Sequence, residues 1–135
     1  MRPGRTLVLV VLVISAASCA ATTYDTSISS QTAAPTTTVP PTGTAAELLP
    51  ELVTEAAGLS ALIVGKGDKF AVVERIEALW AVARDEVVGT DRDIATEIDA
   101  EIAKGRDAAT SNVPAAADKV YRNLKALVQA YLTVA

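Results

Sequence analysis

Apolar residues recur at spacings of three and four from Ala45 to the end of the chain, and this period constrains the fold more than any other feature. Such spacing places the apolar side chains on one face of an α-helix. Breaks at residues 65–67, 89–90 and 111–114 divide the region into four segments. Because no segment alternates with a period of two, we predict an all-α fold, a small antiparallel four-helix bundle with short turns.

The first two expected helices cover residues 45–64 and 69–88. Pro50 lacks an amide N–H, and its ring opposes the carbonyl four residues back, so either the regular helix begins near Leu49 or it is kinked at Pro50. Asp68 is the expected N-cap of the second helix, and Gly89 is expected to close it. The predicted apolar faces are Leu48, Leu52, Ala56, Leu59 and Ile63, then Val72, Val73, Ile76, Leu79, Trp80, Ala83 and Val87.

The third expected helix covers residues 91–109, and the fourth begins at Pro114 and runs to near the terminus. Thr90 and Asp93 resemble a capping box at the start of the third helix. Gly105 is expected to weaken that helix near its end. The predicted apolar faces are Ile94, Ile98 and Ile102, then Val120, Leu124, Leu127, Val128, Tyr131 and Leu132.

A different pattern occupies the first 18 residues. Arg2 and Arg5 precede an almost wholly apolar run at residues 7–17, which small residues follow. This order is typical of a secretory signal peptide. A spanning helix needs about 20 apolar residues, so the run is short for one, although an uncleaved N-terminal membrane anchor is the alternative.

Cys19, the only cysteine, directly follows this segment. The sequence Ala16-Ala17-Ser18-Cys19 resembles the lipobox of bacterial lipoproteins, with an alanine where the family usually has leucine. The resemblance implies cleavage before Cys19 and acylation of that cysteine, with palmitate among the expected chains. Two or more acyl chains hold a protein stably on a membrane. We therefore expect export and anchoring at the outer face of the cell membrane, or at the periplasmic side of an envelope membrane.

Residues 20–43 are rich in Thr, Ser, Pro and Ala and carry one charge, Asp25. Such a segment buries too little apolar surface to offset its ordering entropy, so we predict a disordered tether. It is either an O-glycosylated stalk or an unmodified linker. The predicted organisation is a signal peptide at 1–18, a lipidated cysteine and tether at 19–43, and a helical domain at 44–135.

The charge balance excludes some partners. Residues 44–135 hold 15 Asp and Glu against 10 Lys and Arg, and the whole chain has a formal charge of −4. A phosphate-tracking nucleic-acid binder needs clustered positive charge, so we expect no nucleic acid as a partner. The same balance argues against electrostatic docking on anionic lipid.

The residue inventory also limits chemistry. The sequence contains no histidine, and no cysteine follows Cys19, which excludes imidazole and thiolate metal sites and serine–histidine triads. We predict no catalytic, cofactor or metal site, and no enzyme. Trp80 and Tyr131 are expected to pack in the core.

Two groups of carboxylates are the remaining candidates. Asp93, Glu97 and Glu101 share one helix face at a spacing of four, where they could hold a cation through oxygen ligands. The favoured interpretation is that they face solvent or the basic residues of the last helix, Lys119, Arg122 and Lys125. The second group, near Gly89, lacks the spacing of a calcium loop and is interpreted as solvated surface: Asp85, Glu86, Asp91 and Asp93.

The predicted chain has an anchor and a tether, and its domain carries no set of catalytic residues. This combination favours a lipoprotein that acts by binding. We expect the helical domain to be a binding or accessory module for a protein partner in the envelope. The alternative is a small-ligand or cation-binding lipoprotein that serves transport.

Overall fold

The computed structural model describes residues 39–135. They form four helices, with no strand among them: α1 (Ala45–Gly65), α2 (Lys69–Thr90), α3 (Arg92–Ser111) and α4 (Pro114–Val134). This result confirms the predicted all-α class. The predicted signal peptide, Cys19 and most of the tether lie outside the described residues.

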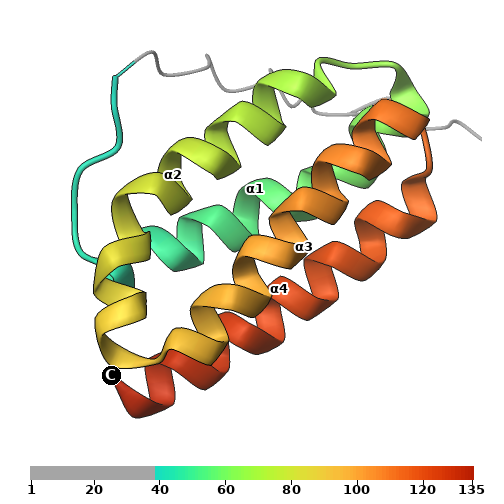
Figure 1. Ribbon diagram of the computed structural model, residues 1–135. Coiled ribbons are helices and arrows are strands. Elements are labelled where there is room, and N and C mark those ends of the chain that lie inside the picture. Colours follow the sequence, from blue (N-terminus) through green and yellow to red (C-terminus); the bar gives the residue numbers. More distant parts are fainter. Residues whose placement is uncertain (1–38) are drawn as a thin grey trace, which may run out of the picture. The chain divides into compact units, whose positions relative to one another are not determined.

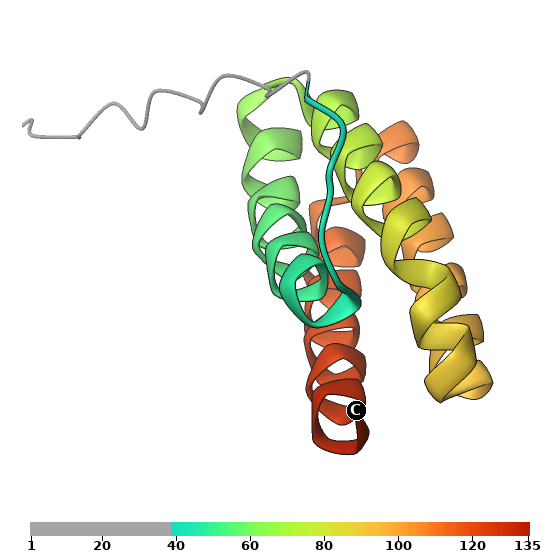
Figure 2. The ribbon, with the colours of Figure 1, turned by 90° about the vertical axis from the view of Figure 1, so that its left-hand side faces the viewer.

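Each helix of the bundle packs against two others (Figure 1). α1 lies between α2 and α4, and α3 also lies between α2 and α4, whereas α1 and α3 have little contact with each other. The α1–α2 seam therefore lies on the side of the bundle opposite the α3–α4 seam. Figure 2 shows the same bundle turned by 90°.

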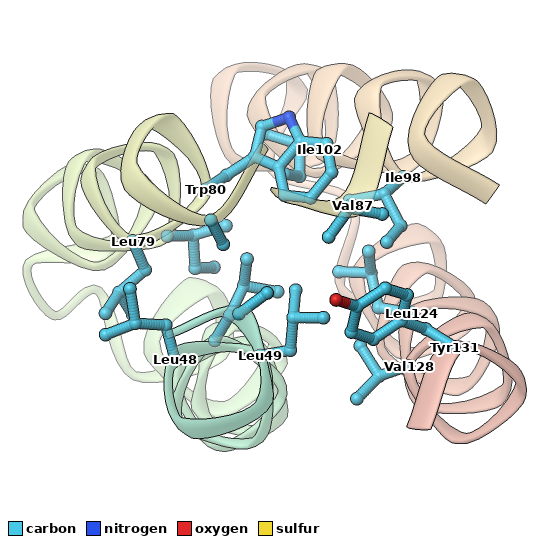
Figure 3. Packing of buried hydrophobic residues seen from close by; sticks show 14 of the residues in the cluster. Leu48, Leu49, Leu79, Trp80, Val87, Ile98, Ile102, Leu124, Val128 and Tyr131 are labelled. Atoms are coloured by element: carbon cyan, nitrogen blue, oxygen red, sulfur yellow. The ribbon is translucent and has the colours of Figure 1, made fainter. Parts of the chain in front are cut away.

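The core contains side chains from all four helices (Figure 3). Tyr131 and Trp80 are its largest members, with 1% and 5% of their surfaces exposed, which confirms the predicted core packing of both. Most of the predicted apolar positions are buried. Val72, Ile94 and Leu127 are half-buried and pack against the core, whereas Leu132 at the chain end is 43% exposed.

The structure contradicts one of the two predicted alternatives for α1, the one in which the helix begins near Leu49. The helix begins at Ala45 and continues through Pro50, so it does not begin near Leu49. Thr44 and Glu47 form a capping box, and the Thr44 amide donates to Glu47 Oε2 at 2.9 Å. This cap satisfies groups at the helix start and offsets the backbone hydrogen bond that Pro50 cannot make.

The boundary between α2 and α3 also differs from prediction. Gly89 does not close α2, because the helix continues through Thr90. The N-cap of α3 is Asp91 rather than Thr90, and its Oδ1 accepts from the amides of Asp93 and Ile94 at 2.9 and 3.0 Å. Gly89 costs α2 about 1 kcal/mol relative to Ala, and Asp91, two residues later, stabilises the start of α3.

The other two turns follow the sequence signals. Asp68 caps α2 by accepting from the Ala71 amide at 3.0 Å, and α4 begins at Pro114, as predicted. The left-handed position after α1 belongs to Lys66, with φ at 55°, rather than to a glycine. Gly67 packs closely beside it: a Cβ atom there would lie 2.6 Å from Leu62 Cδ2, so that the end of the Leu62 side chain would have to shift.

The segment before α1 lies along the α1–α2 seam. The Ala45 amide donates to Glu86 Oε2 at 2.8 Å, near the end of α2, and Arg75 Nη1 lies 3.5 Å from the Val39 carbonyl oxygen. Residues 39–44 therefore run beside α2 in the same direction as that helix, from Arg75 toward Glu86 (Figures 1 and 2). Arg75 also pairs with Glu51 of α1 at 2.5 Å, so the segment lies where these two helices meet.

Candidate functional site

Two surface hollows of about 390 and 320 Å³ lie along the seam between α3 and α4. We call them together the α3–α4 groove. Glu101 and Lys104 border both hollows and so mark the centre of the groove. The larger hollow is lined by Glu97, Ala100, Glu101, Lys104, Asn123, Ala126 and Leu127. The smaller is lined by Glu101, Lys104, Asp107, Ala108, Ser111, Val113, Ala116, Lys119 and Val120.

Glu101 is the buried charged residue of the described region, with 6% of its surface exposed. Its Oε1 accepts from Lys104 Nζ at 2.5 Å, one turn along α3. Its Oε2 is closed to solvent and has no hydrogen-bond partner among the described residues. An unsatisfied buried acceptor costs about 1–3 kcal/mol, and more when it is charged.

The spacing along α3 explains why this carboxylate is buried. Ala95, Ile98 and Ile102 are buried, and Glu101 lies three residues after Ile98, on the same helix face. Gly105 follows one turn later and is also buried; a Cβ there would lie 3.5 Å from Val120 Cγ1. That distance is an ordinary van der Waals contact, so α4 packs against α3 here without requiring a glycine, and Glu101 lies in the same seam.

The predicted row of carboxylates does not act as one group. Asp93 and Glu97 are exposed, as the favoured interpretation expects, but Glu101 is not. The ion pair of Glu101 is with Lys104 of its own helix, and not with Lys119, Arg122 or Lys125 of α4. Within residues 39–135, no three carboxylates gather closely enough to hold a metal ion.

The second acidic group caps helices. Glu86 binds the first amide of α1, and Asp91 binds two amides at the start of α3. Both carboxylates are therefore engaged by backbone N–H groups. Asp85 and Asp93 are exposed, in agreement with the predicted solvated surface.

A third acidic residue, Asp99, was missed by sequence reasoning. Its Oδ1 accepts from the Trp80 indole N–H at 2.6 Å, and its two oxygens accept from Arg84 at 2.9–3.2 Å. The Arg84 hydrogen bond is the main cause of the lowered pKa of Asp99, and the Trp80 hydrogen bond lowers this pKa further against the opposing effect of burial. These contacts join α2 to α3. Because both oxygens of Asp99 accept hydrogen bonds within the bundle, we assign this residue a structural role.

The aromatic residues do not form a binding patch of their own. Phe70 is 49% exposed, and the Lys69 ammonium lies 5.2 Å from its ring centre. Tyr121 is half-buried and packs against the core, far along the chain from Phe70. Trp80 and Tyr131 are buried, so the α3–α4 groove is the better candidate site.

One described helix, α1, is long and apolar enough by length and composition to cross a membrane. Its apolar residues include Leu49, Leu52 and Leu59, which are buried in the bundle. Packing in the core of the bundle accounts for the composition of this helix.

In comparisons with protein-family models, curated proteins and solved structures, no match to this chain was found.

Proposed function

We propose that this protein is a membrane-anchored extracytoplasmic lipoprotein whose antiparallel four-helix domain binds a protein partner in the envelope through the α3–α4 groove. Short turns joining successive helices support the antiparallel arrangement, because each turn leaves room only for a reversal of the chain. The observation that carries the proposal is the groove itself. It has two hollows on one seam, and a buried carboxylate with an unused oxygen lies between them.

The position of the groove suits a tethered binding module. The segment before α1 lies on the α1–α2 seam, where Arg75 contacts Val39 and Glu51. The groove lies on the opposite side of the bundle, so residues 39–44 do not cover it. A partner can therefore occupy the groove while the chain stays attached to the membrane.

The anchor in this proposal is Cys19, and the tether is the segment up to residue 43. A flexible chain of that length has a mean span of about 25–30 Å. This span holds the domain near the membrane surface but leaves it able to turn toward a partner. Tethering to the membrane raises the local concentration of the module around envelope proteins, so a modest groove affinity is sufficient.

The binding face is tested by photo-crosslinking in cells that make the full chain. A photoreactive amino acid replaces Ala100 or Ala126, which border the larger hollow, and in a matched control replaces Ala81, an exposed alanine of α2. We expect both groove positions to crosslink to the same protein and Ala81 to give no such product. Equal products from all three positions, or none from the groove, would overturn the proposed face.

The anchor is tested separately. Cys19→Ala is expected to abolish labelling by a fatty-acid probe and to block processing before residue 19. Ser18→Gly is the matched control, since it keeps a small residue before the cysteine. Full labelling and normal membrane retention of Cys19→Ala would show that the anchor is something else.

The alternative function is binding of a small ligand or cation in support of transport. Glu101 favours a ligand with a hydrogen-bond donor or a positive charge, because its Oε2 has no partner in the described region. A divalent cation needs several oxygen ligands, and Glu97 is the nearest carboxylate in sequence that shares the hollow. Calorimetric titration of the full chain with Ca²⁺ and Mg²⁺ tests this alternative: heat that disappears in Glu101→Gln would support it over the protein partner.

A further inference from the structure

We propose that the α3–α4 groove receives a lysine side chain of the protein partner, whose ammonium group binds Glu101 Oε2. This inference rests on the proposed function, because it names the chemical group that the groove recognises. It starts from the one buried carboxylate oxygen that lacks a hydrogen-bond partner in residues 39–135. A donor brought by a ligand would supply that missing hydrogen bond.

The charge at the groove favours a cation. Glu97, Glu101 and Asp107 border it, against Lys104 and Lys119. At Glu101 itself, the pairing with Lys104 uses Oε1 only. A hydrogen bond between an ammonium and a carboxylate is about twice as strong as one between neutral groups, so a cationic donor gains most from Oε2.

Access to Oε2 depends on Lys104. The carboxylate oxygen is closed to solvent, and the Lys104 side chain that pairs with Oε1 of the same carboxylate is 61% exposed. A long, exposed lysine changes rotamer without disturbing the core. When Lys104 swings out, the partner's ammonium takes its place or shares the carboxylate with it. Lys104 is therefore a competitor for the site.

The shape of the groove favours lysine over arginine. A guanidinium binds best as a fork to both oxygens of a carboxylate, so it must displace Lys104 from Oε1, whereas an ammonium can also share the carboxylate with Lys104. A compact ammonium needs only one oxygen. The larger hollow also offers apolar walls from Ala100, Ala126 and Leu127 along which the four-carbon stem of a lysine can lie.

The test measures binding of small probes to the full, lipidated chain in nanodiscs by amide NMR shifts. The probes are acetyl-lysine methylamide, the norleucine analogue that lacks the ammonium, the arginine analogue and butane-1,4-diamine. We expect the lysine probe to shift amides of both α3 and α4 beside the groove, with an affinity about tenfold above that of the norleucine probe. Equal affinities for these two probes would overturn the inference.

Two variants move the affinity in opposite directions. Glu101→Gln is expected to weaken the lysine probe about tenfold, while Glu97→Gln, an exposed carboxylate on the same hollow, is expected to change it by less than threefold. Lys104→Ala is expected to tighten binding several-fold, because it removes the competitor. A merely structural role for Glu101 predicts no gain in Lys104→Ala, so weaker or unchanged binding in that variant would overturn the inference even if Glu101→Gln failed to fold.

The remaining arms identify the source of the ammonium. Binding of the diamine that is tighter than that of the capped lysine would replace the protein partner with a soluble diamine and overturn the inference. Tighter binding of the arginine probe than of the lysine probe would show that the groove prefers a guanidinium, and would also overturn the inference. If the lysine probe fails while Ala100 and Ala126 still crosslink to one protein, the lysine inference is wrong and the proposed function stands. If neither groove position crosslinks to a protein when the rest of the chain is unchanged, the proposed function itself is wrong.

Discussion

The indole N–H of Trp80 donates to Asp99 Oδ1 at 2.6 Å, which joins the most bulky side chain of α2 to a carboxylate of α3. Trp80 is 5% exposed, and Asp99 supplies the acceptor that its largely buried N–H needs. In Figure 3 the indole nitrogen points toward α3, away from the centre of the core. The contact lets a large aromatic residue occupy an otherwise apolar core.

Replacement of Asp99 is expected to separate the two contacts that it makes. Asp99→Ala should lower the free energy of unfolding by about 2 kcal/mol, because it leaves the Trp80 N–H unsatisfied. Asp99→Asn keeps an acceptor for Trp80 and loses the ion pair with Arg84, so it should cost about 1 kcal/mol or less. Urea unfolding followed by Trp80 fluorescence measures both. Glu97→Ala, an exposed neighbour on α3, serves as the control and should change stability by less than about 0.5 kcal/mol.

The lowered pKa of Asp99 predicts how stability depends on pH. Its pKa is lower in the folded chain than in the unfolded chain, chiefly because of the hydrogen bond from Arg84. The resulting stabilisation is complete above the unfolded pKa, about 3.9, and is lost as the pH falls through the lowered folded value. Between pH 7 and pH 2.5, wild type should therefore lose more unfolding free energy than Asp99→Asn does. Parallel losses in the two proteins would contradict this account.

Glu86 is expected to stabilise the start of α1 from a distance of 41 positions in the chain. Glu86→Ala leaves the Ala45 amide without its carboxylate acceptor, and loss of a comparable helix cap costs about 1 kcal/mol. Glu86→Gln keeps an accepting oxygen and should cost less. Hydrogen exchange at the Ala45 amide should speed up in Glu86→Ala but not in Asp85→Ala, whose side chain is exposed beside it.

Two glycine substitutions are expected to have effects of opposite sign. Gly58 lies inside α1, and a Cβ there would meet nothing within 4 Å, so Gly58→Ala should raise the free energy of unfolding by about 0.5–1 kcal/mol. Gly67→Ala would place its Cβ 2.6 Å from Leu62 Cδ2. Leu62 must then shift, and we expect a loss of about 1 kcal/mol. Thermal unfolding of the two variants checks the signs directly; the same sign for both would show that the turn after α1 is not sterically tight.

Much of the fold could be predicted from local sequence signals. The helical period identified four apolar faces, and Asp68 and Pro114 marked helix starts because capping and proline geometry act within a few residues. The start of α1 was less certain, since Pro50 argued for a later beginning while Thr44 and Glu47 supplied a cap earlier. Gly89 gave a wrong end for α2, because the position of the next helix start, set by the Asp91 cap, lets α2 continue to Thr90.

The candidate site was harder to predict because it depends on contacts between helices. Glu101 lies three residues after Ile98, which is a core spacing, but a carboxylate at such a position is usually assigned to the surface. Glu101 lies in the seam where α4 packs on α3, and sequence spacing along α3 alone does not give that packing. The same holds for Asp99 and Glu86, whose partners are 19 and 41 positions away.

The path of residues 39–44 has a mechanical consequence. A pull on the tether acts first on the weak contact between Arg75 and Val39, and next on the cap formed by Thr44 and Glu47. Because the segment runs along α2 from Arg75 to Glu86 before the chain turns into α1, these contacts open one at a time rather than all together. A force applied to the chain before residue 39 would thus be absorbed by a few residues before it reached Leu48 and Leu49 in the core.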